Sequence, residues 1–202
     1  MQVSVDVVID AITATLDEVA KELKGKMSNR TWTQKILGEL ADMPARVMGD
    51  GVVAYPNKDA GEWLFDMVWC RNENTGCDYH TLREIDLVLE SEWSHNVEEV
   101  RYDFEKLLIA KSPLKVLIAD DYRWAGTESD GCVTKMIEEE LRSFSPALPS
   151  ETYLVALYQG DGGVFKYRRY ELVSHGGVNE WRRTDYDGQS WLETPFCERR
   201  CK

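Results

Sequence analysis

The chain has no long hydrophobic run, few histidines and no dense set of cysteines. None of its apolar stretches approaches the roughly 18 residues that a membrane-spanning helix needs, and its first twenty residues lack the basic segment that opens a signal peptide. Its five cysteines are an odd number and lie far apart, unlike the disulfide pattern of a small secreted protein. We therefore expect a cytoplasmic protein with no membrane contact.

Several common catalytic motifs are also missing. The sequence contains no P-loop, no dinucleotide-binding glycine motif and no recognisable Ser/His/Asp arrangement. The glycine-rich stretch 160–163 lies between two predicted strands and is not followed by a helix. It therefore indicates a turn rather than a phosphate-binding loop.

The chain is rich in hydrophobic residues and has a net negative charge. Its 202 residues are 43% hydrophobic and include seven Trp, nine Tyr and five Phe, which is enough for one globular domain. The net charge of −12 argues against a protein that coats nucleic acid nonspecifically. The excess acid is concentrated in residues 1–160, because residues 161–202 hold eight Lys or Arg against seven Asp or Glu.

Hydrophobic periodicity predicts an α/β fold. Apolar residues at helical spacing predict a helix over 6–24, and a capping-box pattern at Thr31 predicts a second helix that ends before Pro44. We expect one α/β domain over 1–160, with its core at about 31–160, and a C-terminal hairpin and tail over 161–202 that pack on it. The further predicted elements are strands at 51–56, 62–70 and 83–93, a helix at 97–111, a strand at 114–120, a helix at 133–144, and a hairpin formed by 152–159 and 164–173.

Two acids lie side by side in a predicted strand. Residues two apart in a strand share a face, so Glu90 and Glu92 point the same way within an otherwise apolar segment. Such a pair is unfavourable in a half-buried place unless a cation or a proton intervenes, and Mg²⁺ prefers carboxylate oxygens. The alternative is a solvent-facing pair on an edge strand.

Two further acids lie among apolar residues. Asp66 is the one charged residue of the run 63–69, and a buried lone carboxylate needs a partner. An ordinary hydrogen-bonded aspartate is the alternative. Glu39 falls within the apolar arc of its predicted helix, where it either faces a polar site or lies at the helix rim.

Together these acids resemble the pattern of the PD-(D/E)XK, or restriction-endonuclease-like, nuclease superfamily. The fold of that superfamily runs helix, three strands, helix, strand, with an acid on the first helix, an aspartate on the second strand and an E-x-K motif on the third. Glu39, Asp66 and the tripeptide 90–92 occupy those positions, and the resemblance covers roughly residues 31–120. The strings EWLFDMVW, LVLESEW and DFEKLL also resemble an uncharacterised bacterial family within this superfamily.

The resemblance implies metal-assisted hydrolysis of nucleic acid, with DNA as the expected substrate. Asp66 and Glu90 would bind Mg²⁺ or Mn²⁺, Glu39 would be an outlying metal ligand, and Glu92 or a lysine would act on the attacking water. The pattern places its lysine at position 92, where this chain has Glu92. Some members supply a lysine from the following helix, which makes Lys106 the candidate and Lys111 a weaker one.

A basic and aromatic stretch near the C-terminus is a candidate nucleic-acid surface. The alternative is the outer face of an ordinary strand. A different class of function also stays open, in which an inactive nuclease fold or an acidic inhibitor or immunity-type protein binds a basic protein partner. A homodimer is compatible with either function. The candidate nucleic-acid-binding residues are Lys166, Arg168, Arg169, Arg182 and Arg183.

Overall fold

The computed structural model describes most of the chain. The described residues are 3–23, 28–56, 63–74, 80–121, 132–144, 147–160, 162–175 and 177–196. The helices are α1 (Val5–Glu22), α2 (Asn29–Ala41), α3 (Met43–Val47), α4 (Val97–Ile109) and α5 (Cys132–Ser143). The strands are β1 (Val52–Tyr55), β2 (Met67–Asn74), β3 (His80–Glu92), β4 (Leu114–Asp120), β5 (Thr152–Gln159), β6 (Val164–His175), β7 (Val178–Tyr186) and β8 (Trp191–Thr194).

All eight strands form one mixed sheet in which the spatial order follows the chain order, β1 to β8. The neighbours β3–β4 and β4–β5 are parallel, and every other neighbouring pair is antiparallel. The two parallel connections run through α4 and α5, as parallel neighbours require a crossover. The predicted α/β class and the strand–strand–helix–strand order are therefore confirmed.

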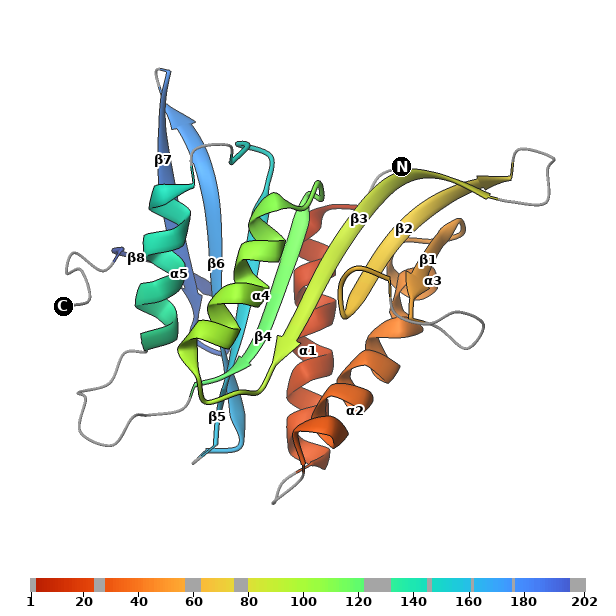
Figure 1. Ribbon diagram of the computed structural model, residues 1–202, viewed down its shortest axis with the longest axis horizontal. Helices are drawn as coiled ribbons and strands as arrows, with labels where there is room; N and C mark the ends of the chain where they lie inside the picture. The colour runs from red at the N-terminus through yellow and green to blue at the C-terminus, as the bar shows by residue number, and fades with distance from the viewer. Residues whose placement is uncertain are drawn as a thin grey trace.

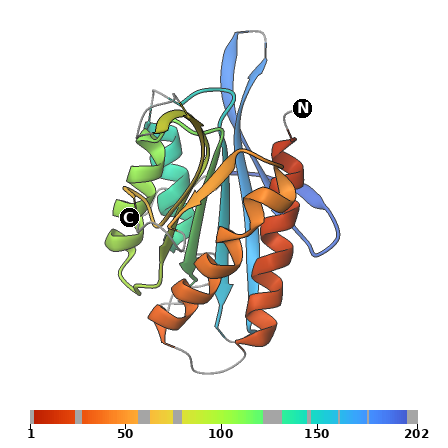
Figure 2. The same cartoon turned by 90° about the vertical axis from the view of Figure 1, so that its right-hand side faces the viewer.

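Helices cover both faces of the sheet, which makes three layers (Figures 1 and 2). Apolar residues of α1 and α2 pack on one face, where Trp32 contacts the rings of Trp93 and Tyr158. Apolar residues of α4 and α5 pack on the other face, where Phe104 contacts the ring of Tyr153. Because side chains alternate along a strand, successive buried residues of the central strands belong to opposite cores.

The first helices begin and end close to the predicted residues, with one correction. α2 begins at Asn29, and Ser28 rather than Thr31 is the N-cap, because the Ser28 hydroxyl accepts a hydrogen bond from the Thr31 amide at 3.2 Å. Pro44 lies in the first turn of the short α3, a position where the missing amide proton costs nothing. None of the described helices is long and apolar enough to cross a membrane.

The C-terminal region contains more sheet than the sequence predicted. The hairpin of β5 and β6 is confirmed, and its turn has Gly163 at φ 62°. Beyond it, β7 and β8 extend the sheet by two strands that hydrophobic patterning did not reveal. Most side chains of β7 are exposed or half-buried, so the strand carries little apolar alternation.

Candidate functional site

The centre of the site is Glu90, a buried carboxylate in the middle of the sheet. Glu90 pairs with Leu117 of β4, and the pairing of β3 with β2 ends one residue earlier, at Leu89. Its side chain is buried, because Glu90 is 1% exposed. The alternative of a solvent-facing edge strand is therefore wrong. Val88 belongs to the core under α4, and the two-residue period directs Glu90 to the same face.

Lys106 forms an ion pair with Glu90. Its Nζ lies 2.6 Å from Glu90 Oε1 and 2.8 Å from Asp103 Oδ1. Val100, Phe104 and Leu107 anchor α4 in the core, and Asp103 and Lys106 lie on the flank of that buried stripe. The candidate lysine of the following helix thus reaches the strand acid.

The charge state of Lys106 follows from these contacts. Burial alone would lower the pKa of its ammonium, but the hydrogen bonds to Asp103 and Glu90 outweigh that effect and raise it above its ordinary value. Lys106 therefore stays protonated at neutral pH. It can stabilise negative charge, but it cannot accept a proton.

Asp66 lies just before β2 rather than inside a strand, which corrects the predicted strand start. A tight turn precedes it, in which the Phe65 amide donates to the Trp63 carbonyl at 2.7 Å and Leu64 has φ 60°. A side chain as large as leucine rarely adopts this backbone conformation. The turn directs Asp66 to β3, where its Oδ2 accepts a hydrogen bond from the Ser91 amide at 2.7 Å.

Asp66 is close enough to Glu90 to affect the ionisation of Glu90. Burial raises the pKa of Glu90, the hydrogen bond from Lys106 lowers it, and the Asp66 carboxylate raises it again, to about 7 overall. Glu90 is therefore poised between its charged and neutral forms at neutral pH. A second cation at this place would favour the charged form.

Glu92 is half-buried, and its Oε1 accepts a hydrogen bond from the Ser94 amide at 2.6 Å. Burial raises the pKa of Glu92, the Ser94 amide lowers it, and the Asp103 carboxylate raises it. Asp103 is thus a site residue that the sequence reasoning missed. Its position next to the buried stripe of α4, three residues before Lys106, was the signal that could have identified it.

The acids of this site fit a hard divalent cation that keeps much of its water. Asp66 and Glu90 offer carboxylate oxygens, and burial raises the pKa of Glu90 despite its ion pair with Lys106. Within the described ranges, no three His, Cys, Asp or Glu side chains already stand in the arrangement of a metal site. Mg²⁺ is often bound by one or two carboxylates, with water and substrate oxygens completing its coordination.

Glu39 is placed away from these acids. It lies on α2, whose apolar residues pack on the opposite face of the sheet from α4. Its side chain is 45% exposed and forms an ion pair with Lys35 at 3.0 Å. The structure therefore places Glu39 at the helix rim, the alternative that the sequence left open.

The five basic residues of the predicted nucleic-acid surface are divided between the two faces of the sheet. Arg169 pairs with Asp6 of α1 and with Glu171, and Arg182 also pairs with Glu171. Arg168 and Arg183 point to the other face and are buried under α5. Lys166 is exposed. These residues therefore do not form one continuous basic surface.

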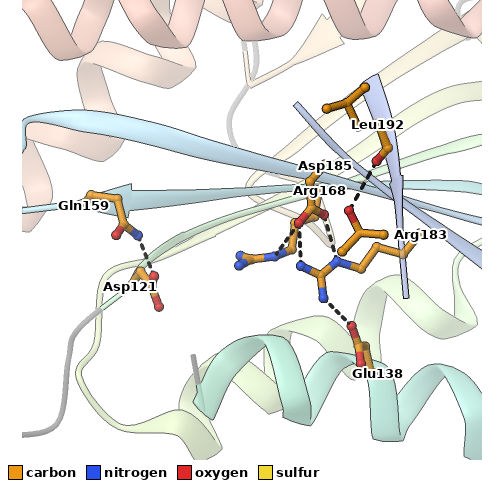
Figure 3. Close-up of polar contacts among 8 residues, drawn as sticks. Asp121, Glu138, Gln159, Arg168, Arg183, Asp185 and Leu192 are labelled. Atoms are coloured by element: carbon orange, nitrogen blue, oxygen red, sulfur yellow. Dashed lines mark hydrogen bonds and ion pairs between the residues drawn. The ribbon is translucent and has the colours of Figure 1, made fainter. Parts of the chain in front are cut away.

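Arg183 is the centre of the buried polar cluster under α5 (Figure 3). Its Nε and Nη2 donate to Asp185 at 2.7 and 2.5 Å, and its Nη1 donates to Glu138 at 2.9 Å. The Nε of Arg168 lies 4.0 Å from the same Asp185 carboxylate. This cluster ties α5 to β6 and β7.

Comparisons of the chain with protein-family models, with curated protein sequences and with solved structures gave no match.

Proposed function

We propose that this protein is a metal-dependent nuclease that hydrolyses phosphodiester bonds of nucleic acid with Mg²⁺ or Mn²⁺. The observation that carries the proposal is the convergence of Asp66, Glu90 and Lys106. These residues come from the turn before β2, from β3 and from α4, and they are 40 residues apart in the chain at most. Two carboxylates beside a protonated lysine suit a reaction in which negative charge develops on a phosphate.

The order of elements supports the same proposal. From α2 onward the chain runs helix, three strands, helix, strand, with the five-residue α3 inserted before β1. Asp66 lies just before the second strand, and Glu90 lies on the third. The restriction-endonuclease-like superfamily has this order of elements and acids, and we propose that fold for residues from α2 through β4.

Each residue would have a distinct role. Asp66 and Glu90 would hold the metal ion. When bound, a divalent metal ion polarises the phosphate and makes a water molecule more acidic. Lys106 stays protonated and would stabilise charge on the phosphate, whereas Glu92, whose pKa is raised, would orient the water and accept its proton.

Cleavage of labelled single- and double-stranded DNA and RNA, with and without Mg²⁺ or Mn²⁺, tests this proposal. We expect metal-dependent cleavage by the wild-type chain and a loss of at least about a hundredfold in Asp66→Asn and Glu90→Gln, since each removes a metal ligand. Glu84→Gln is the matched control, because Glu84 is an exposed glutamate on the same strand. Absence of cleavage on every substrate would reject the enzyme.

A second candidate is a protein of the same fold that binds without catalysis. Two observations favour it. Lys106 already forms ion pairs with two carboxylates, and Glu92 stands at the position where the superfamily pattern has its lysine. A melting temperature that rises with Mn²⁺ in the absence of cleavage would indicate an inactive nuclease fold. No response to Mn²⁺ would favour an acidic protein that captures a basic protein partner through its charge of −12.

A further inference from the structure

A second polar site lies under α5, at the other end of the same face of the sheet. Arg168 of β6 is paired with Asp185 of β7, and Tyr170 is paired with Arg183. α5 lies above these pairs, because Glu138 accepts a hydrogen bond from Arg183 at 2.9 Å.

The helix direction places Thr134 above Arg168. α5 connects the parallel strands β4 and β5, so it runs opposite to them and to β7. Because the two elements run in opposite directions, Thr134 lies from Glu138 on the same side as Asp185 lies from Arg183. The two steps are also nearly equal in length, since one helical turn and two strand residues each cover roughly 6 Å. Thr134 thus lies in the first turn of α5, over the Arg168–Asp185 pair.

Several buried polar atoms at this place have no hydrogen-bond partner in the described part of the chain. They are Nε and Nη1 of Arg168, the hydroxyl of Tyr170 and the hydroxyl of Thr134. All four can donate a proton, and leaving such a group without a partner inside a protein costs about 1–3 kcal/mol. The side chain of Arg168 is 6% exposed, so bulk water does not satisfy it.

The neighbouring carboxylates are already engaged. Arg183 donates to both oxygens of Asp185 and to Oε1 of Glu138, and Arg142 lies 3.6 Å from Oε2 of Glu138. Figure 3 shows the terminal nitrogens of Arg168 directed away from the Asp185 carboxylate that Arg183 holds. Among the described residues of this cluster, the carboxylates are engaged and the unpartnered polar atoms can all donate.

We propose that Thr134, Arg168 and Tyr170 form a binding site for a small free oxyanion of the phosphate class, between the first turn of α5 and β6. A tetrahedral oxyanion presents several acceptors at once, which these donors need. The amide groups and the dipole of the first helical turn favour an anion at the same place. The four atoms are each exposed by less than 1 Å², so a ligand as large as a nucleotide cannot reach them. This proposal is independent of the nuclease proposal.

Phosphate titration of the purified full-length chain tests the site, by calorimetry and by thermal melting against NaCl of equal ionic strength. We expect inorganic phosphate to raise the melting temperature of the wild type, since it binds the folded state. Arg168→Met should weaken phosphate binding at least about tenfold, because it removes a charge-assisted hydrogen bond. Thr134→Val and Tyr170→Phe keep the side-chain shape and should each weaken it several-fold.

Arg169→Met is the matched control. Arg169 is the next residue of β6, points to the opposite face and pairs with Asp6, so phosphate binding should not change. Two results would overturn the proposal: a wild-type melting temperature that phosphate raises no more than NaCl does, or unchanged phosphate affinity in Arg168→Met. An equal response to a mononucleotide such as AMP would overturn the assignment to a free ion.

Discussion

Two buried polar sites lie at opposite ends of one row of residues across the sheet. The row runs from Glu90 through Leu117 and Val155 to Arg168, and its side chains point to the face covered by α4 and α5. At the β3 end, Glu90 and Asp103 pair with Lys106, and the Asp66 carboxylate acts on Glu90. The β6 end is different, because its carboxylates are engaged and its unpartnered groups are donors.

The two ends differ in which buried groups lack a full partner, and this difference indicates whether a cation or an anion would bind. Burial raises the pKa of Glu90, and the neighbouring carboxylates of Asp66 and Asp103 raise it further, so a cation is favoured there. An excess of donors favours an anion. The two apolar residues between them belong to the core and keep the two sites apart. The following four substitutions test this comparison.

The largest effect is expected at the β6 end, in Arg183→Met. This change leaves Glu138 and Asp185 without their main partner in a buried place, which should lower the free energy of unfolding by about 3–5 kcal/mol. Urea unfolding measures it. Arg182→Met is the control, because Arg182 is an exposed partner of Glu171 and should cost about 1 kcal/mol or less. Equal losses in both variants would show that burial of the cluster is unimportant.

A pH-dependent effect is expected at the β3 end, in Glu90→Gln. The pKa of Glu90 rises from 4.5 to about 7 on folding, so folding favours its protonated form. Its contribution to stability is complete below the lower value and is lost as the pH rises through the higher one. The metal-free wild type should therefore lose on the order of 3 kcal/mol relative to Glu90→Gln across this range.

Urea unfolding of both proteins at a series of pH values, with a chelator present, measures the Glu90 effect. Glu84→Gln should follow the wild type, because Glu84 is exposed. A constant difference between wild type and Glu90→Gln at all pH values would contradict a buried, titrating Glu90.

A smaller loss is expected in Lys106→Met, which removes the cation from the acid-rich end. Glu90 and Asp103 then lose a charged hydrogen-bond donor, and the free energy of unfolding at alkaline pH should fall by about 2 kcal/mol. The loss should be smaller at acid pH, where Glu90 is protonated. A loss independent of pH would mean that Lys106 acts through packing alone.

The smallest effect is expected in Leu64→Gly, in the turn before Asp66. Leu64 has φ 60° and is 74% exposed, so glycine relieves strain and little apolar contact is lost. We expect a gain of up to about 1 kcal/mol in the free energy of unfolding. A loss of stability would show that the Leu64 side chain has a packing role.

The acid-rich end was largely predictable from the sequence. Asp66 and Glu90 are charged residues in apolar segments, and the two-residue period of a strand directs Glu90 to the face that α4 covers. Lys106 was a candidate through the resemblance to a superfamily in which some members supply the lysine from the following helix. Asp103 was missed because exposed acids are common on helices, and Glu39 was misplaced because a helical wheel does not show which face of the sheet the helix covers.

The donor-rich end was not predictable in the same way. Arg168 and Arg169 are neighbours in a basic stretch, and both were predicted to belong to a nucleic-acid surface. Their side chains point to opposite faces, because consecutive residues of a strand alternate. β7, which pairs with Arg168, has little apolar alternation of its own.

The sequence by itself determined the α/β class, most helices and strands, and the acids that lie among apolar residues, because periodicity and buried charge are local properties of the chain. The tertiary structure alone decided that β3 is central, that α2 and α4 cover opposite faces, and that Lys106 meets Glu90. It also decided which arginine of the β6 pair is buried. These features depend on strand pairing and helix placement between residues distant in the chain, which no local pattern encodes.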